Sequence, residues 1–165
     1  MKKPVVGILM GSDSDIEIMQ EAARVLGDFK IAHEMVITSA HRSPKRTILY
    51  AETAAKRGLK VLIAGAGAAA HLAGVVAAHT TLPVVGVPID SSSLKGLDSI
   101  LSTVQMPGGV PVAGMAIGRA GSKNAALLSV EILALSSASL RRRLESYRKK
   151  MERDVVEKDK KLRRQ

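Results

Sequence analysis

The sequence predicts an α/β protein in which helices cover both faces of a parallel sheet. Short apolar runs, each long enough for one buried strand, alternate along the 165 residues with segments whose apolar residues recur at helical spacing. Glycine, serine or proline separates most runs from the segments that follow. Five such runs favour a three-layer, Rossmann-like architecture with the flavodoxin-like strand order over the six-stranded dinucleotide-binding order.

The elements are expected in regular alternation. The strands are predicted at residues 5–10, 32–38, 60–64, 83–87 and 112–117. The helices are predicted to run from residue 13 or 14 to 26, from 44 to 57, from the 65–67 turn to 80, from 121 to 135 and from 139 onward, with a short helix near 94–103 inside the long loop 88–111. Asp13 or Ser14 suits a helix start, Pro44 a first helical turn, and Gly58 a helix end.

The composition excludes several classes of protein. There is no cysteine, which rules out disulfides, a thiolate zinc site and a cysteine nucleophile. The first apolar run, residues 5–10, is too short for a signal core or a membrane span. We therefore expect a cytoplasmic location and no membrane partner.

The net charge of +10 resides mainly in the C-terminal segment. Residues 141–165 hold 12 Lys/Arg and 5 Asp/Glu, which is +7, whereas the remaining residues hold 13 and 10, which is only +3. Proteins that track nucleic-acid strands combine a basic groove with stacking aromatic residues, and this chain has one Phe, two Tyr and no Trp. We therefore expect no nucleic-acid partner.

The C-terminal helix has a narrow apolar stripe on an otherwise charged segment. The stripe consists of Leu144, Tyr147, Met151 and Val155, spaced by three, four and four residues. So thin a stripe needs another surface to cover it, either its own domain or a neighbouring subunit. The expected organisation is a catalytic domain over residues 1–138 and a basic, protruding helix over 139–165.

Right-handed crossovers place all strand-to-helix loops at one edge of such a sheet, where these folds bind ligands. The first loop contains Ser12, Ser14 and Asp15 at the start of a helix. Free amides, the positive end of the helix dipole and two hydroxyls suit a phosphate there, and a carboxylate one turn in suits a ribose diol. Ordinary helix capping explains the same residues equally well.

The second loop contains Ser39, His41 and Arg42. Histidine gains or loses a proton near neutral pH, and arginine grips phosphate or carboxylate with paired donors. The pair at the ligand edge of a parallel sheet indicates a functional site.

The third loop contains Gly65, Gly67 and His71. It resembles a dinucleotide fingerprint, but it follows the third predicted strand, Ala70 replaces the last glycine, and the first acidic residue downstream is Asp90. We interpret it as bare backbone that lets a small planar group or a carboxylate come close, with His71 either assisting or capping a helix.

Four segments together resemble the PurE family of purine biosynthesis, class I, over residues 5–135. They are Gly-Ser-Asp-Ser-Asp at 11–15, Ser-Ala-His-Arg-Ser-Pro at 39–44, Ala-Gly-Ala-Gly at 64–67 with Ala-His-Leu at 70–72, and Gln-Met-Pro-Gly-Gly-Val-Pro at 105–111. The chain departs from the usual family pattern at Ser43, Ala68 and Ala73, where Thr, Gly and Pro are typical.

The resemblance implies an isomerase that converts N5-carboxyaminoimidazole ribonucleotide to 4-carboxy-5-aminoimidazole ribonucleotide. It implies that His41 is the general acid/base and that Ser12, Asp15 and Arg42 bind the phosphate and ribose, with Ser14 and Ser39 beside them. The loop of Gly65, Gly67 and His71 would contact the migrating carboxylate. It further implies a homo-octamer without metal, biotin or nucleotide cofactor, coupled to an upstream ATP-dependent carboxylating synthetase, whose C-terminal helix reaches neighbouring subunits.

Three alternatives remain open from the sequence. A class II relative would carboxylate aminoimidazole ribonucleotide with free carbon dioxide, although the 105–111 run favours class I. A PurE-like domain that carboxylates a nicotinate nucleotide is disfavoured by the missing cysteine and the lack of an extra domain. A non-catalytic nucleotide-binding module on the same fold would bind without turnover, and it would not need His41.

Overall fold

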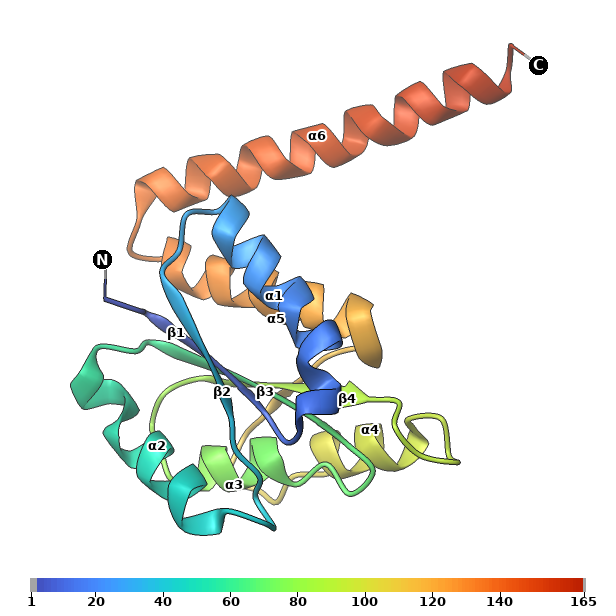
Figure 1. Ribbon diagram of the computed structural model, residues 1–165. Helices are drawn as coiled ribbons and strands as arrows, with labels where there is room; N and C mark the ends of the chain where they lie inside the picture. The colour runs from blue at the N-terminus through green and yellow to red at the C-terminus, as the bar shows by residue number, and fades with distance from the viewer. Residues whose placement is uncertain (1–2, 165) are drawn as a thin grey trace. The chain divides into compact units, whose positions relative to one another are not determined.

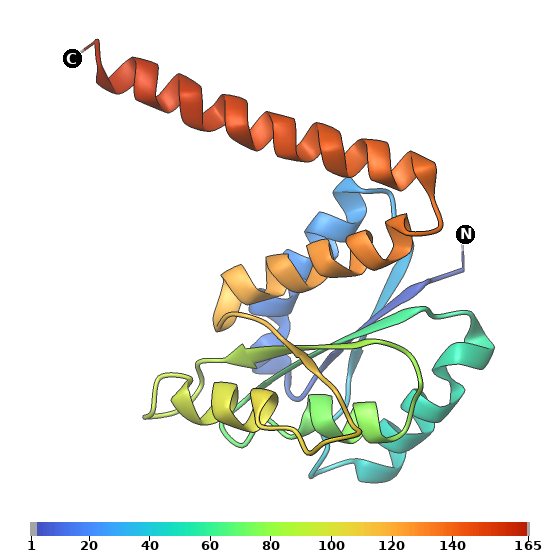
Figure 2. The ribbon, with the colours of Figure 1, turned by 180° about the vertical axis from the view of Figure 1, so that it is seen from behind.

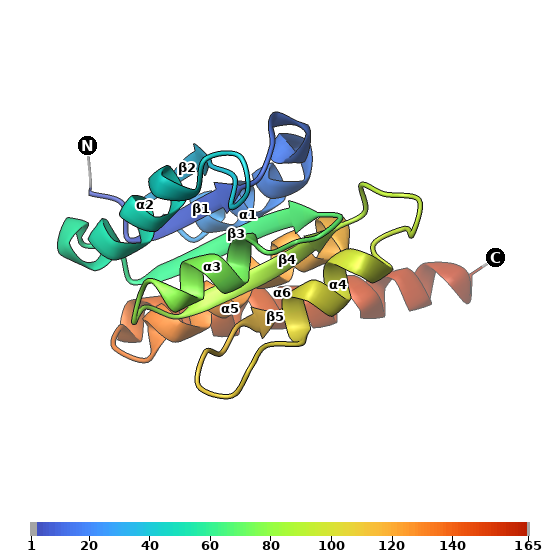
Figure 3. The same ribbon diagram turned by 90° about the horizontal axis from the view of Figure 1, so that it is seen from below.

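Five parallel strands form one sheet in the order β2-β1-β3-β4-β5 in this computed structural model, which describes residues 3–164 (Figure 1). The flavodoxin-like order predicted from the sequence is therefore confirmed. The strands are β1 (Val6–Met10), β2 (His33–Ile37), β3 (Val61–Gly67), β4 (Val84–Ile89) and β5 (Ala113–Gly114). All of their carboxyl ends point the same way, so the loops that follow them share one edge (Figure 3).

Helices cover both faces of this sheet. The helices are α1 (Ile16–Asp28), preceded by the 3-10 turn η1 (Asp13–Asp15), then α2 (Pro44–Arg57), α3 (Leu72–Ala78), α4 (Leu97–Val104), α5 (Gly118–Ala134) and α6 (Ala138–Leu162). On one face lie α1 and the first part of α5, and on the other lie α2, α3 and α4 (Figures 1 and 2). The Oγ of Ser122 accepts a hydrogen bond of 3.1 Å from the Ala22 N–H, which joins α5 to α1.

The apolar runs of the sequence form the buried central strands of the sheet. Every residue of β1 and β4 is buried, as are the first five residues of β3, because helices cover both sides of these central strands. β2 lies at an edge of the sheet and is only partly buried. α2 begins at Pro44 and ends before Gly58, whose φ of +99° closes the helix in the left-handed conformation, as predicted.

Several boundaries differ from the prediction. β3 continues to Gly67, so the glycine-containing turn belongs to the strand. β5 covers only Ala113–Gly114 of the six residues predicted, because the chain leaves the sheet edge and turns into α5 at Gly118, where φ is +73°. The predicted short helix is confirmed as α4, but it begins three residues later than expected.

Residues 130–164 form a second compact unit, made of the end of α5 and of α6. Within it, Arg148 donates a 2.7 Å hydrogen bond to Glu131. The side chain of Leu144 is buried, whereas Met151 and Val155 are 52% and 65% exposed. The predicted domain boundary and subunit contacts of this segment stay predictions. Within residues 3–164, no helix has the combination of length and apolar character that crossing a bilayer requires.

Candidate active site

The first strand-to-helix loop is closed by a capping box. The Ser12 Oγ accepts the Ser14 N–H at 3.4 Å, and the Asp15 carboxylate accepts the Ser12 N–H at 3.1 Å. Ser12, and not Asp13 or Ser14, is thus the capping residue. The Asp15 side chain is buried, and this burial raises its pKa despite the hydrogen bonds from Ser12 and Ser14. The Ser12 hydroxyl donates to Asp13 and lowers the pKa of that exposed carboxyl.

The second loop is held by its own hydroxyls. The Ser43 Oγ accepts the Ser39 N–H at 2.9 Å, and the Ser39 Oγ accepts the Arg42 N–H at 3.1 Å. Beneath them, the hydroxyls of Thr38 and Thr47 lie 2.8 Å apart and connect the end of β2 to α2. Four side chains thus fix the loop that carries His41 and Arg42. Ser43 supplies the hydroxyl that accepts the Ser39 N–H in this set of hydrogen bonds.

Arg42 joins the first two loops. Its Nη2 donates a 2.8 Å hydrogen bond to the carbonyl oxygen of Gly11, at the end of β1. The guanidinium is otherwise exposed and lines the same cavity as Ser12, which caps the first helical turn. Arg42 and Ser12 line two hollows, a larger one of about 330 Å³ and a smaller one of about 260 Å³ on the side of Ile37 and Ser43. A cation between two hollows at a helix start suits an anionic ligand group.

The third loop places His71 beside His41 of the second loop. The Nε2 of His41 lies 2.8 Å from the Nδ1 of His71, and the rings meet edge to face with centroids 4.9 Å apart. One of these two nitrogens carries the proton and the other accepts it. Both imidazoles are exposed to the open side of the loops. His71 immediately precedes α3, so the edge of the sheet places a proton donor and a proton acceptor together.

These loops enclose a cavity of about 330 Å³ at the carboxyl ends of β1 to β4. It brings together eight of the nine predicted site residues, namely Ser12, Ser14, Asp15, Ser39, His41, Arg42, Gly67 and His71. Ala66, Ala69 and Leu72 add a small apolar wall. One wall therefore offers charge and hydroxyls and the other offers backbone and methyl groups, which suits a polar ligand with one flat end. The roles of the individual residues stay predictions.

Gly65 is the predicted residue that does not line this cavity. It is buried inside β3, and a side chain there would collide with Met19 of α1. Its carbonyl oxygen accepts the Gly11 N–H at 3.2 Å, so the residue supports the first loop from below. The structure thus gives Gly65 a packing role, while its predicted contact with a ligand stays untested.

Ser91 lines the cavity and was missed by the sequence reasoning. It lies in the loop after β4, and its side chain occupies the space above Gly67 that a Cβ would fill. A serine in a run of three serines carries no distinguishing signal. Only its position four residues after the predicted strand 83–87, at the edge where loops bind ligands, pointed to it.

The run at residues 105–111 connects α4 to β5 and does not reach the cavity. α4 runs back across the sheet from the site edge, and the run then connects its end to the start of β5 (Figure 3). Met106 contacts α3 beside Gly74, and no residue of the run lines the cavity. Of the long loop, only its beginning reaches the site.

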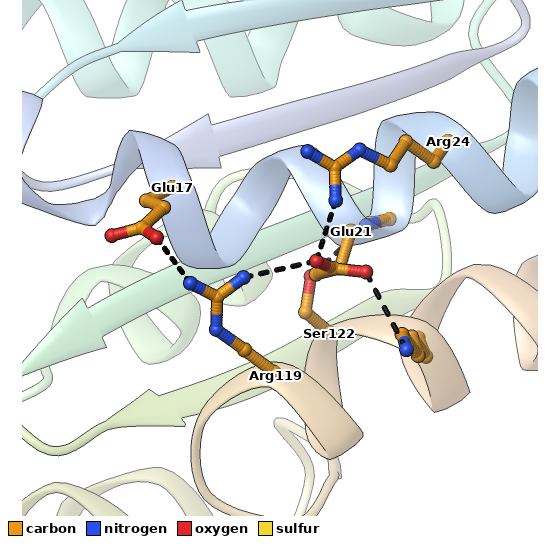
Figure 4. Close-up of polar contacts among 7 residues, drawn as sticks. Glu17, Glu21, Arg24, Arg119 and Ser122 are labelled. Carbon is orange, nitrogen blue, oxygen red and sulfur yellow. Dashed lines mark hydrogen bonds and ion pairs between the residues drawn. The ribbon is translucent and has the colours of Figure 1, made fainter.

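An ionic cluster fixes the helix that follows the first loop. Arg119 of α5 binds both Glu17 and Glu21 of α1, and the same Glu21 is bound by Arg24 at 2.7 Å and Lys123 at 3.6 Å (Figure 4). Burial would raise the pKa of Glu21, but the surrounding cations outweigh it and lower the pKa. Because α1 starts directly after Asp15, this cluster holds the helix that follows the first loop against α5.

The comparisons with known proteins agree with this geometry. The profile of the AIR carboxylase family matches residues 5–154. The chain belongs to this family. A family member from Pyrococcus horikoshii, named N5-carboxyaminoimidazole ribonucleotide mutase, is 55% identical over 161 residues, which cover 98% of this chain and 90% of that protein.

Two further relatives show how much the length of the matching proteins varies. The Schizosaccharomyces pombe protein named phosphoribosylaminoimidazole carboxylase is 54% identical over 162 residues, which cover 98% of this chain but 29% of that protein. The crystal structure of Treponema denticola PurE matches with a TM-score of 0.86 at 32% identity, covering 96% of this chain and 98% of that one. The AIR carboxylase family thus includes both proteins of about this size and a much longer chain.

Proposed function

We propose that this chain is an N5-carboxyaminoimidazole ribonucleotide mutase of de novo purine biosynthesis. It moves the carboxylate from the exocyclic nitrogen of N5-carboxyaminoimidazole ribonucleotide to the ring carbon, which gives 4-carboxy-5-aminoimidazole ribonucleotide. The observation that carries the proposal is the meeting of His41 and Arg42 with the first loop in one cavity. The likeness to the P. horikoshii mutase over nearly the whole chain supports it.

The polar wall of the cavity binds the ribonucleotide. Arg42 and the hydroxyls of Ser12 and Ser14 take the phosphate at the start of the first helix, where amides and the helix dipole favour an anion. Asp15 takes a ribose hydroxyl. The base then points toward the apolar wall and the two histidines, where water is displaced by backbone and methyl groups.

The chemistry needs one proton donor that later acts as an acceptor. The imidazolium of His41 gives its proton to the exocyclic nitrogen as the bond from nitrogen to the carboxylate carbon breaks, which releases carbon dioxide. The nucleophilic ring carbon then forms a bond to the held carbon dioxide, and His41 removes the proton from that carbon. The proton balance closes within one turnover. Orientation and exclusion of water supply the rest of the rate, and no metal, biotin or nucleotide cofactor takes part.

The assembly and cellular setting are part of the proposal. The exposed apolar residues of α6, Met151 and Val155, support a contact with neighbouring subunits in a homo-octamer. An unstable carbamate substrate favours functional coupling to the ATP-dependent synthetase that makes it. A cytoplasmic location stays a prediction of the sequence.

A second candidate is direct carboxylation of aminoimidazole ribonucleotide by free carbon dioxide. The name of the S. pombe relative, phosphoribosylaminoimidazole carboxylase, favours it. Both reactions form the same product and use the same ring carbon, so the cavity serves either. They differ in where the carbon dioxide comes from.

Two parallel assays on the purified protein separate the candidates. One receives the N-carboxylated ribonucleotide, the other receives the uncarboxylated ribonucleotide with bicarbonate, and both follow the ring-carboxylated product. We expect fast conversion in the first assay alone. Efficient product in the second at ordinary carbon dioxide levels identifies the carboxylase, and no product in either contradicts both candidates.

A further inference from the structure

Two polar side chains, His71 and Ser91, line the cavity along with the apolar residues of the third loop. One of them already has a hydrogen-bond partner. His71 Nδ1 lies 2.8 Å from His41 Nε2. The other polar side chain is the hydroxyl of Ser91, which forms no hydrogen bond with any of residues 3–164. Gly67 lies directly beside this hydroxyl and has no side chain that could compete for it. A ligand group that reaches this end of the cavity meets the Ser91 hydroxyl as its open side-chain donor.

The fold builds the place for this hydroxyl. Gly67 ends β3 and pairs with Ile89, the last residue of β4, so the Ser91 loop passes directly beside it. A side chain at position 67 would collide with the Ser91 Oγ and Cβ and would also approach the Ile89 carbonyl oxygen to 3.1 Å. Glycine at this position therefore leaves the Ser91 hydroxyl room inside the cavity.

We infer that Ser91 is a substrate-binding residue that donates a hydrogen bond to the migrating carboxylate. The inference rests on the proposed function. With phosphate and ribose held by the loops after β1 and β2, the base end of the ribonucleotide lies across the sheet toward β3 and β4. The carboxylate is the charged group of that end, and a hydroxyl donor to a charged acceptor makes one of the stronger hydrogen bonds.

Binding of two ligands that differ only in the carboxylate tests the inference. The probes are the ring-carboxylated ribonucleotide and the uncarboxylated aminoimidazole ribonucleotide, each titrated calorimetrically into the full-length protein. We expect Ser91→Ala to weaken the carboxylated ligand about tenfold or more and to leave the uncarboxylated one within about twofold. Ser91→Thr keeps the hydroxyl and retains the affinity ratio of the wild type. Ser93→Ala, an exposed neighbour outside the cavity, is the matched control.

The outcomes separate the failure of this inference from that of the proposed function. Equal weakening of both ligands by Ser91→Ala, or weakening of neither, overturns the role of Ser91 while the mutase proposal stands on the wild-type protein. Wild-type protein that binds neither ligand overturns both. Thermal unfolding of each variant accompanies the titrations, and because Ser91 is exposed and has no hydrogen-bond partner among residues 3–164 we expect an unchanged midpoint.

Discussion

At the scale of single residues, His41 carries the chemistry that the account assigns to the cavity. His41→Asn keeps a polar group of similar size but removes the acid/base. We expect it to bind ribonucleotide with near wild-type affinity and to lose about two to four decades of kcat. His79→Asn is the matched control, because His79 lies at the end of α3 beside Glu52 and outside the cavity. Steady-state turnover near wild type in His41→Asn would remove His41 from the mechanism.

The backbone of Ala68, between the cavity-lining residues Gly67 and Ala69, is strained. Its φ is +51°, a left-handed conformation that disfavours a Cβ. We expect Ala68→Gly to raise the free energy of unfolding by up to about 1 kcal/mol, since glycine relieves the strain by more than it gains in unfolded entropy. The adjacent Ala69 has no positive φ, so Ala69→Gly should lower the free energy of unfolding by a few tenths of a kcal/mol. Urea denaturation measures both, and equal effects of the two variants would argue against strain at Ala68.

The site residues that sequence reasoning identified are those whose chemistry is distinctive. His41, Arg42 and the Ser-Asp helix start stand out because histidine, arginine and capping residues directly after strands have few structural uses together. Ser91 did not stand out, because a serine among serines has no such signature. Gly65 was assigned to the ligand because a glycine that admits Met19 cannot be told from one that admits substrate until the packing is known.

At the scale of elements, the cluster of Arg119 with Glu17 and Glu21 joins α1 to α5. We expect Arg119→Ala to lower the urea midpoint more than Arg24→Ala does. Arg24 is exposed and pairs with Glu21 within one helix, and such pairs contribute little, whereas Arg119 bridges two helices. A larger loss from Arg24→Ala would contradict the bridging role. Because α1 follows the first loop, we also expect weaker ribonucleotide binding in Arg119→Ala alone.

A second polar group connects β2 to α2 and predicts a pH dependence. Burial raises the pKa of Glu34, but hydrogen bonds from the Tyr50 hydroxyl at 2.7 Å and from Arg57 at 2.5 Å outweigh it and lower the pKa. The unfolded chain therefore takes up the proton first as the pH falls. The stabilisation is complete above the ordinary value of 4.5 and disappears as the pH drops through the folded pKa.

The matched variants are Glu34→Gln and Glu52→Gln. We expect wild type and Glu52→Gln to lose more unfolding free energy between pH 5 and pH 3 than Glu34→Gln does, measured by urea denaturation at each pH. Parallel losses in all three proteins would contradict the role assigned to Glu34. A second check is Tyr50→Phe, which removes one donor and should reduce the same pH dependence.

Elements were predictable where local chemistry agrees with tertiary packing. α2 matches at both ends because Pro44 and Gly58 encode them in the backbone itself. β5 was overestimated because residues 112–117 are apolar enough for a strand, yet only two of them pair with β4 before the chain turns to α5. The position of the 105–111 run depends on the direction of α4, which no local pattern specifies.

At the scale of the whole molecule, the α6 stripe makes the proposed assembly testable. Val155 belongs to the stripe, whereas Val156 lies on another side of the helix, and both are exposed in this chain. We expect Val155→Glu to reduce the octamer to smaller species and Val156→Glu to leave it intact, as measured by light scattering on a sizing column. Identical masses for both variants would remove the stripe from the interface.

The most direct test of the account follows the carboxylate carbon itself. The N-carboxylated ribonucleotide is prepared with ¹³C in the carboxylate and converted by the wild-type protein in unlabelled bicarbonate, and mass spectrometry reads the product. If the cavity holds the released carbon dioxide until the ring carbon captures it, most of the label appears in the ring-carboxylated product. Product with the isotopic composition of the bicarbonate pool would mean that the carbon dioxide comes from solution, and the carboxylate migration proposed for this site would be wrong.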